Sequence, residues 1–238
     1  MFTEYHCHVL PGIDDGADSA ETSLGMLAMM QEQGVTRITA TPHFYAHREK
    51  SVARFLEKRQ AAYEKIRTNA SFKDIRLGAE VAIEHGISEL PDIEKLAFTG
   101  TDLILLELPY REFAPWMSEE IYNISAEYHL RVILAHVHRY LEYYSKNDVR
   151  TILASDAIMQ INNEAFSGWT ERRFVKSLIA EGKPVIFGSD AHNLGNRRPN
   201  WDLLAKKGKP DVIEASNRVL DQHILNEKQA AAYARTDR

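Results

Sequence analysis

Cysteine is nearly absent from this chain, and long hydrophobic runs are lacking altogether. The single cysteine, Cys7, has no partner for an intramolecular disulfide. The longest apolar stretches fall far short of the roughly 20 residues that cross a bilayer, and no secretory signal follows Met1. We therefore expect a cytoplasmic protein without membrane insertion, folded in a reducing compartment.

An excess of positive charge is also lacking. The chain carries 29 Lys and Arg against 34 Asp and Glu, which gives a formal net charge of −5. This balance argues against a nucleic-acid partner, although a local positive site built from metal ions is compatible with it. The 238 residues, 44% of them hydrophobic, suffice for a substantial core. With no clear linker in the sequence, we expect a single domain over residues 1–238.

Seven segments have the composition of strands, and several are near-continuous apolar runs. Such runs are typical of parallel strands that are buried on both faces. The predicted strands are Phe2–His8, Val35–Thr41, Asp74–Ala82, Asp102–Leu108, Arg131–His136, Ala157–Asn162 and Pro184–Gly188.

Helical patterns lie between the predicted strands. A first helix is opened by the capping pair Asp18 and Glu21 and ended by Gly34, and the chain after residue 200 is expected to be helical. The other predicted helices are Ser51–Thr68, Ser118–His129, Asn147–Ser155 and Thr170–Gly182. This alternation predicts βαβ units and an α/β fold, with the seven strands in one closed or distorted barrel.

Two histidines stand one residue apart near the end of the first predicted strand. Alternate side chains of a strand share a face, so His6 and His8 lie about 6–7 Å apart along the chain and point the same way. That spacing suits two imidazoles that bind one metal ion. The turn that follows, Pro11–Gly16, adds carboxylate oxygens from Asp14 and Asp15.

Most of the other predicted strands also end in a potential metal ligand. The carboxyl ends of the strands of a βα barrel meet at one rim, and ionised carboxylates there are costly unless they find cations. The predicted ligands are His6, His8, Asp15, His43, Glu80, Glu107, His136, Asp190 and His192. Nine ligands of mixed nitrogen and oxygen type suit two or three divalent ions, and they do not choose sharply among manganese, iron and zinc.

Five short motifs contain most of these residues in order along the chain. They are His6–Gly16, Thr41-Pro42-His43, Gly78-Ala79-Glu80, Ala135–Tyr140 and Ser189–Asn193. In these motifs the chain resembles the PHP (polymerase and histidinol phosphatase) superfamily. Within it, the chain is most similar to the metal-dependent protein-tyrosine phosphatases of bacterial capsule and exopolysaccharide loci.

The resemblance implies a fold, a cofactor and a substrate class. The fold is a distorted (β/α)7 TIM-like barrel that holds three divalent metal ions, manganese before iron or zinc. Asp15 rather than Asp14 is the ligand of the acidic turn. The implied activity is hydrolysis of phosphotyrosine by a metal-activated hydroxide. The implied partner is an autophosphorylated bacterial tyrosine kinase that controls capsule or exopolysaccharide synthesis.

Three residues outside the ligand set are candidates for catalysis. Arg139, and Arg197 or Arg198, are candidates to hold phosphate oxygens. The resemblance supports this role for Arg139 and favours Arg197 over Arg198. His138 departs from the family pattern, which usually has Glu at this position. If the strand continues, His138 faces the same way as His136 and could protonate the leaving group, although a surface histidine is the simpler expectation.

Cys7 is tested separately, because many tyrosine phosphatases use a cysteine nucleophile. That chemistry needs an arginine six positions later, where this chain has Ile13. Cys7 also points away from both neighbouring histidines. We therefore reject it as a nucleophile and expect it to pack in the core.

Two other functions stay open at this point. One is a small-molecule phosphoesterase such as a histidinol-phosphate phosphatase, against which the acidic turn argues. The other is a non-catalytic, metal-binding regulatory module, which the intact ligand set disfavours.

Overall fold

The computed structural model describes residues 1–49, 51–72 and 75–226. Asp74, the predicted start of the third strand, lies outside these residues. All strand pairs are parallel, and the strands form two sheets. The first sheet has the order β1 (Phe2–Glu4), β2 (Val35–Ala40) and β4 (Ile75–Leu77). The second has the order β3 (His43–Phe44), β5 (Glu80–Ala82), β6 (Leu103–Glu107), β7 (Arg131–Leu134), β8 (Ile158–Asn162) and β9 (Val185–Gly188).

The two sheets are joined by strands that are interrupted once. Thr41 and Pro42 separate β2 from β3, and Gly78 and Ala79 separate β4 from β5. Proline has no N–H to donate to a ladder, and a Cβ on Gly78 would lie 2.5 Å from Phe98 Cδ1. The predicted strand Asp74–Ala82 is therefore split into β4 and β5, whereas the predicted strand Val35–Thr41 corresponds to β2 and β3 lies just beyond its end.

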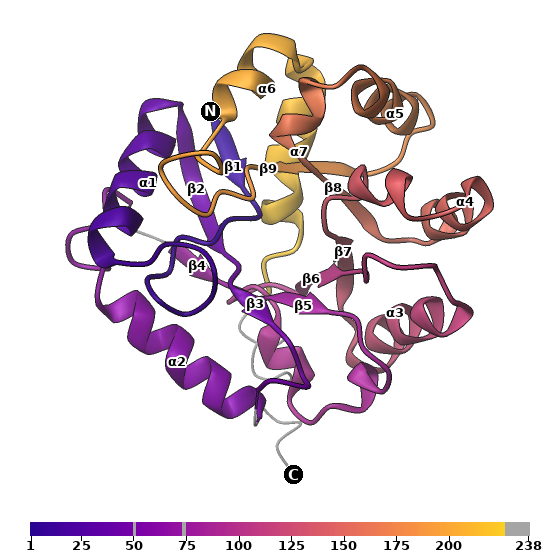
Figure 1. The fold of residues 1–238 in the computed structure, drawn as a ribbon, viewed down its shortest axis with the longest axis horizontal. Coiled ribbons are helices and arrows are strands. Elements are labelled where there is room, and N and C mark those ends of the chain that lie inside the picture. Colours follow the sequence, from indigo (N-terminus) through magenta and orange to yellow (C-terminus); the bar gives the residue numbers. More distant parts are fainter. Residues whose placement is uncertain (50, 73–74, 227–238) are drawn as a thin grey trace.

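The chain segments that follow β1 and β9 are hydrogen-bonded to each other, which joins the first sheet to the second. The backbone N–H of Asp190 donates to the His6 carbonyl at 2.8 Å, and that of His8 donates to the Ala191 carbonyl at 2.9 Å. Cys7 and Ala191 form a parallel bridge there. The strands thus surround a common centre (Figure 1), and the prediction of an α/β, distorted (β/α)7 barrel-like fold is confirmed.

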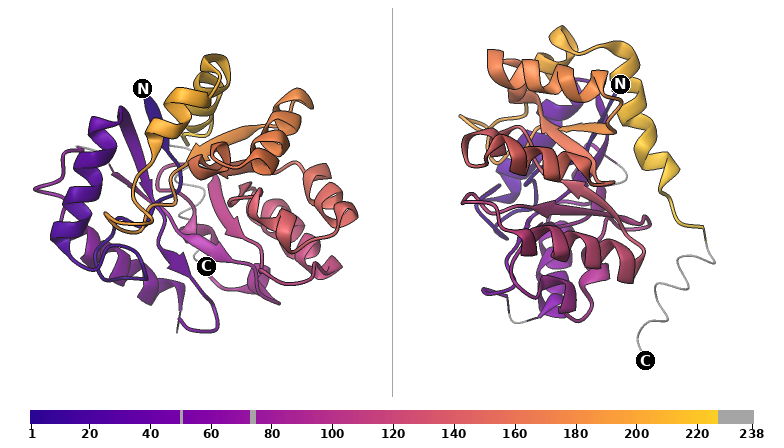
Figure 2. Two further views of the ribbon diagram at one scale, coloured as in Figure 1. Left: turned by 45° about the horizontal axis from the view of Figure 1, so that its top comes forward. Right: turned by 90° about the vertical axis from the view of Figure 1, so that its right-hand side faces the viewer.

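Helices surround the strands on the outside (Figures 1 and 2). They are α1 (Ala20–Glu32), α2 (Val52–Glu64), α3 (Pro115–Tyr128), α4 (Lys146–Ala154), α5 (Trp169–Ala180), α6 (Trp201–Lys207) and α7 (Pro210–Gln222). Short 3-10 helices are η1 (Ile87–Glu89), η2 (Ile93–Leu96), η3 (Arg139–Glu142) and η4 (Asn163–Phe166). None of the helices in the described ranges has the length and apolar character that a membrane crossing requires.

The predicted cap of the first helix was wrong by one residue. The N-cap of α1 is Ser19, whose hydroxyl accepts the backbone N–H of Thr22. Asp18 instead accepts the hydroxyl of Thr22. Serine and aspartate are similarly good N-caps, so local sequence alone does not separate them.

The interior of the barrel is apolar at one end only. Tyr5, Leu105, Ile133 and Ile186 belong to a buried cluster that also contains Leu220 of α7. The Tyr5 hydroxyl donates to the Ser216 carbonyl at 2.7 Å and accepts the Leu220 N–H at 2.9 Å. Helix α7 therefore covers this end, and the polar groups of the interior gather beyond it at the carboxyl ends of the strands.

Glu4 fastens the first strand to the last. Its fully buried carboxylate accepts the backbone N–H groups of His6 and Ser189, each at 2.9 Å, and the indole N–H of Trp201 at 2.8 Å. Cβ positions are crowded here too, because a Cβ on Gly188 would lie 2.8 Å from that of His6. Hydrogen bonds to a charged acceptor contribute more than neutral ones.

We predict that Glu4→Ala lowers the free energy of unfolding by about 3 kcal/mol, because three buried donors lose their acceptor. Chemical denaturation measures this loss, with the exposed Glu119→Ala on α3 as the matched control. A loss from Glu4→Ala no larger than that from Glu119→Ala would contradict the role of Glu4 as a fastener.

Candidate metal centre

All nine predicted ligands come together at the carboxyl end of the barrel. They form four overlapping groups, and within each group the ligand atoms lie within 4.8 Å of one another. The groups are His8, Asp15, His43 and His192; His6, His8 and Asp190; His6, Glu80 and His136; and His43, Glu80 and Glu107. The cluster thus contains five imidazoles and four carboxylates from both sheets.

Glu80 is the central residue of the cluster. It opens β5, between β3 and β6, so histidines from both sides reach its carboxylate. Its Oε2 atom lies 3.0 Å from His43 Nδ1 and 3.1 Å from His6 Nε2, and its Oε1 atom lies 2.9 Å from His136 Nε2. Only 1% of Glu80 is exposed, so water does not screen these interactions.

Hydrogen bonds on the far side of each ring fix the lone pairs of His6 and His8. Gln160 Oε1 accepts the backbone N–H of His136 at 2.6 Å, so His6 Nδ1, 3.1 Å from the same oxygen, must donate to it. His8 Nδ1 donates to Asp14 Oδ2 at 2.7 Å. In neutral rings, both Nε2 atoms therefore carry lone pairs across a gap of 3.2 Å.

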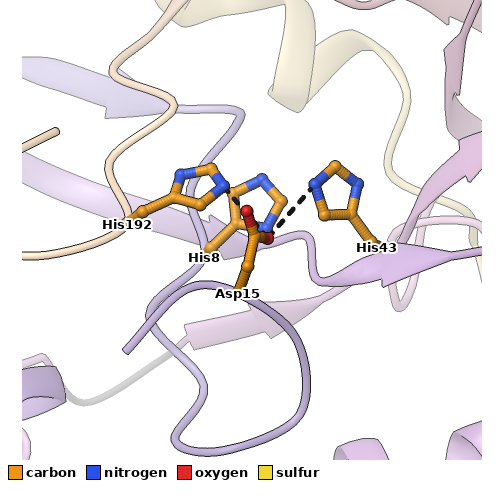
Figure 3. A group of neighbouring side chains, drawn as sticks. All are labelled: His8, Asp15, His43 and His192. Atoms are coloured by element: carbon orange, nitrogen blue, oxygen red, sulfur yellow. Dashed lines mark ion pairs between the residues drawn. The ribbon is translucent and has the colours of Figure 1, made fainter. Parts of the chain in front are cut away.

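A second part of the cluster surrounds Asp15 (Figure 3). The Oδ1 atom of Asp15 lies 3.5 Å from the Nε2 atoms of both His43 and His192. His192 Nδ1 lies 2.9 Å from the Asp190 carbonyl, to which it donates, so His192 Nε2 also carries a lone pair. The ring of His192 packs 3.8 Å from that of His8.

The acceptor atoms of the cluster are better placed to bind a cation than to form hydrogen bonds with one another. Within the described residues, the buried atoms Glu80 Oε2, His43 Nδ1 and His192 Nε2 have no hydrogen-bond partner of acceptable geometry. Buried polar atoms without partners are costly, and converging lone pairs and carboxylates are the donor set of divalent metal ions. The residues present therefore fit the metal site that their positions in the sequence predict.

The electrostatics of the cluster favour positive charge. Burial opposes a charged His136, yet contacts with Glu107 and Glu80 raise its pKa to about 9. Burial likewise opposes ionisation of Asp190, but the neighbouring His6, His8 and Arg139 hold its pKa well below the usual range. A field that stabilises an imidazolium also stabilises a bound cation.

Two of the predicted ligands have an unusual backbone. His136 has a φ of 31° and Asp190 a φ of 50°, a region that residues other than glycine seldom adopt. Each lies two residues beyond the end of a strand, His136 after β7 and Asp190 after β9. The backbone there turns each side chain into the cluster instead of continuing the strand, and such strain is typical of functional sites.

The two predicted arginines lie beside the ligands. Arg139 Nη1 is 2.7 Å from Asp190 Oδ2, and its Nη2 atom is 2.5 Å from Glu164 Oε1. Arg197 Nη2 is 3.1 Å from Asp190 Oδ2. Arg198 is exposed and does not line the cavity described below, so the structure separates the two neighbouring arginines.

A cavity of about 650 Å³ opens onto one side of the cluster. His43, Glu80, Glu107, His136 and Asp190 are part of its lining. Its other lining residues are Tyr45, Tyr110, His138, Arg139, Glu142, Tyr143, Glu164, Ala165, Gly168, Glu171 and Arg197. A ligand in this cavity can therefore touch both the cluster and the two arginines.

The expectation of a surface histidine at position 138 was wrong. His138 is 4% exposed, lines the cavity, and lies with its Nε2 atom 3.8 Å from Glu164 Oε1. The strand does not continue to it, because β7 ends at Leu134 and His138 caps η3. Burial lowers the pKa of His138, and Glu164 opposes this only in part.

Sequence reasoning missed the residues that hold the ligands in place. Asp14 accepts His8 Nδ1 and also the backbone N–H of His43 at 2.9 Å, and these contacts outweigh its burial and lower its pKa to about 2. Gln160 orients His6, and Asn162 donates to Asp190 Oδ2 at 3.0 Å. The signal was available, since polar residues of an otherwise apolar strand β8 must find buried partners.

Cys7 is buried, as expected. Its Sγ atom lies 3.4 Å from the Thr39 carbonyl, and burial raises the pKa of its thiol well above the usual value. A thiol in that state is a poor nucleophile.

Comparisons with known proteins identify relatives of this chain. The profile of a family described as capsular polysaccharide synthesis, CpsB/CapC, matches residues 2–213. The tyrosine-protein phosphatase YwqE of Bacillus subtilis is 27% identical over 207 residues, which cover 82% of this chain and 78% of YwqE. The tyrosine-protein phosphatase CpsB of Streptococcus pneumoniae is 28% identical over 227 residues, with 86% and 90% covered.

A solved structure has the same fold. It comes from work on YwqE and CpsB, described there as unique metal-dependent tyrosine phosphatases. The TM-score is 0.66 at 22% identity, with 98% of this chain and 92% of the other covered.

We predict that Asp14→Asn weakens the binding of divalent metal about 10- to 100-fold, because an amide no longer holds His8 as the carboxylate does. Titration against a metal-chelating dye measures the affinity. Asp18→Asn, the same substitution at an exposed position of the same loop, is expected to leave it unchanged. Equal affinity in both variants would contradict the role assigned to Asp14.

Proposed function

This chain belongs to the CpsB/CapC family of capsular polysaccharide synthesis, and on that premise we propose that it is a metal-dependent protein-tyrosine phosphatase. One observation carries the proposal: nine candidate ligands converge in one cluster, and five of them line a cavity together with two arginines. The named relatives of similar length are tyrosine-protein phosphatases, which supports phosphotyrosine as the substrate.

The proposed cofactor is a set of three divalent ions, manganese before iron or zinc. His6, His8, His43 and Glu80 each belong to two of the four ligand groups, as expected for ions that share ligands. The donors are imidazoles and carboxylates without a thiolate, which suits these metals. Bound there, the ions would supply a hydroxide nucleophile near neutral pH and positive charge beside the attacking and leaving oxygens.

The remaining steps are assigned to side chains of the cavity. Arg139 and Arg197 would bind phosphate oxygens, exchanging part of their contact with Asp190 for the substrate. A phenolate leaves more readily than an alkoxide, since its conjugate acid has a pKa near 10. His138, whose pKa is lowered by burial, would then serve the leaving oxygen as a neutral hydrogen-bond donor.

The proposed partner is a tyrosine-phosphorylated protein in the cytoplasm. The family description, capsular polysaccharide synthesis, supports an autophosphorylated bacterial tyrosine kinase of capsule or exopolysaccharide assembly as that protein. The cluster is reached through a cavity that opens onto one side of it, so a phosphotyrosine on an exposed or extended segment would reach it more easily than one in a folded domain.

We predict that the manganese-loaded protein hydrolyses phosphotyrosine peptides and loses this activity on thorough chelation. Glu80→Gln should lower kcat/KM at least about 1000-fold, because Glu80 contacts four of the five candidate ligand histidines. Phosphate release measures both effects, and Glu84→Gln, near the same strand but paired with exposed His47, is the control. Activity that survives chelation, or a higher kcat/KM for histidinol phosphate, would contradict the proposal.

A second prediction concerns the guanidinium group of Arg139. Arg139→Lys keeps the charge but loses the planar pair of donors, so we expect kcat/KM to fall about 10- to 100-fold with the bound metal unchanged. Steady-state kinetics and metal analysis measure the two quantities, with Arg198→Lys as the exposed control. If Arg139→Lys retains full activity, Arg139 does not bind the phosphate in this way.

A further inference from the structure

Among the described residues that line the cavity, three tyrosines provide the only large uncharged side chains apart from the imidazoles. Of the described residues that line it, the others are titratable side chains or the small residues Ala165 and Gly168. The tyrosines are Tyr45, Tyr110 and Tyr143. An apolar part of a substrate can therefore find favourable contact in few places.

The ring of Tyr45 already contacts other side chains. The guanidinium of Arg48 lies 4.6 Å from the centre of its ring, and the ring of His43 lies 5.2 Å away. Burial raises the pKa of its hydroxyl above the usual range. This leaves Tyr110 and Tyr143, which are 40% and 46% exposed although they are aromatic.

Tyr110 stands directly beside the ligand cluster. It follows β6, and its hydroxyl oxygen lies close to both ring nitrogens of His136, 3.2 Å from Nδ1 and 3.4 Å from Nε2. Its ring is nearly parallel to that of His136, with centres 5.8 Å apart. A group held at the cluster thus lies within reach of one edge of Tyr110.

Tyr143 extends this aromatic surface away from the cluster. Its ring meets that of Tyr110 edge to face, at 5.2 Å between centres. On its other side Tyr110 packs against the buried Tyr140, with ring centres 5.8 Å apart, and the Tyr140 hydroxyl accepts the backbone N–H of Leu108 at 2.8 Å. The ring of Tyr144 stacks on Tyr140 at 5.1 Å, and its hydroxyl donates to the Pro109 carbonyl at 2.6 Å. Tyr110 is therefore supported by buried rings, and Tyr143 by its contact with Tyr110.

We propose that Tyr110 and Tyr143 form a wall on which the aromatic ring of an aryl phosphate packs, and that this wall determines a preference for aryl over alkyl phosphates. The inference rests on the proposed phosphatase function. With the phosphate held between the cluster and Arg139, the leaving group extends outward along the wall. Aromatic rings in contact prefer offset or edge-to-face pairs 4.5–7 Å apart, the geometry that the two tyrosines already show with their neighbours.

The test compares two unreactive ligands that share a phosphonate group, one carrying a phenyl ring and the other a methyl group. Calorimetry on the manganese-loaded protein gives Kd for phenylphosphonate and for methylphosphonate. We expect Tyr143→Ala and Tyr110→Ala each to weaken phenylphosphonate about 3- to 10-fold while methylphosphonate binding is unchanged. Tyr143→Phe and Tyr110→Phe, which keep the rings, should retain the preference. Tyr122→Ala, a 71% exposed tyrosine of α3 outside the cavity lining, is the control.

Two results would overturn the inference. One is that the wild-type protein binds phenylphosphonate no more tightly than methylphosphonate, or that both alanine variants still bind phenylphosphonate more tightly. The other is an equal loss for the two phosphonates, which assigns the tyrosines a general structural role. Failure of the proposed function is a separate result. If the protein shows the expected phosphonate pattern but hydrolyses no phosphotyrosine peptide, the inference about Tyr110 and Tyr143 stands and the proposed phosphatase activity is contradicted.

Discussion

The structure depends on one electrostatic constraint, which is the burial of many hydrogen-bond acceptors together. The carboxylate of Glu80 is buried among histidines, and the ring nitrogens that His6 and His8 turn toward it carry lone pairs in the neutral state. The hydrogen bonds from His6 to Gln160 and from His8 to Asp14 turn those lone pairs inward. Such a cluster of acceptors is costly when buried unless cations enter it. The metal-dependent chemistry proposed for the chain therefore follows from how the buried groups are paired.

The fold supplies the conditions for this constraint. Parallel strands direct their carboxyl ends to one side, and α7 covers the other end of the interior with apolar side chains. Glu4 ties β1 to the loop after β9, so that His6 and Asp190, far apart in sequence, lie on adjacent strand ends. The backbone at His136 and Asp190 adopts a costly conformation that places the side chains in the cluster.

The fold class and the positions of most candidate ligands could be predicted from the sequence because both follow from strand periodicity, whereas the choice of Asp15 over Asp14 came from the family resemblance. An apolar run that ends in Glu107, for example, specifies the buried strand β6 and a carboxylate at its carboxyl end. The capping residue of α1 and the buried position of His138 could not be predicted, since they depend on loop conformation and on a 3-10 turn after β7. The role of Asp14 depends on a contact with His8 that only the folded turn creates.

Anomalous diffraction from crystals of the manganese-loaded protein, collected at the manganese edge, tests the central claim most directly. The account predicts three anomalous peaks within the cluster, one of them bonded to Glu80 and one to Asp15. Clear density for the nine side chains with no anomalous peak among them, under saturating manganese, would contradict it.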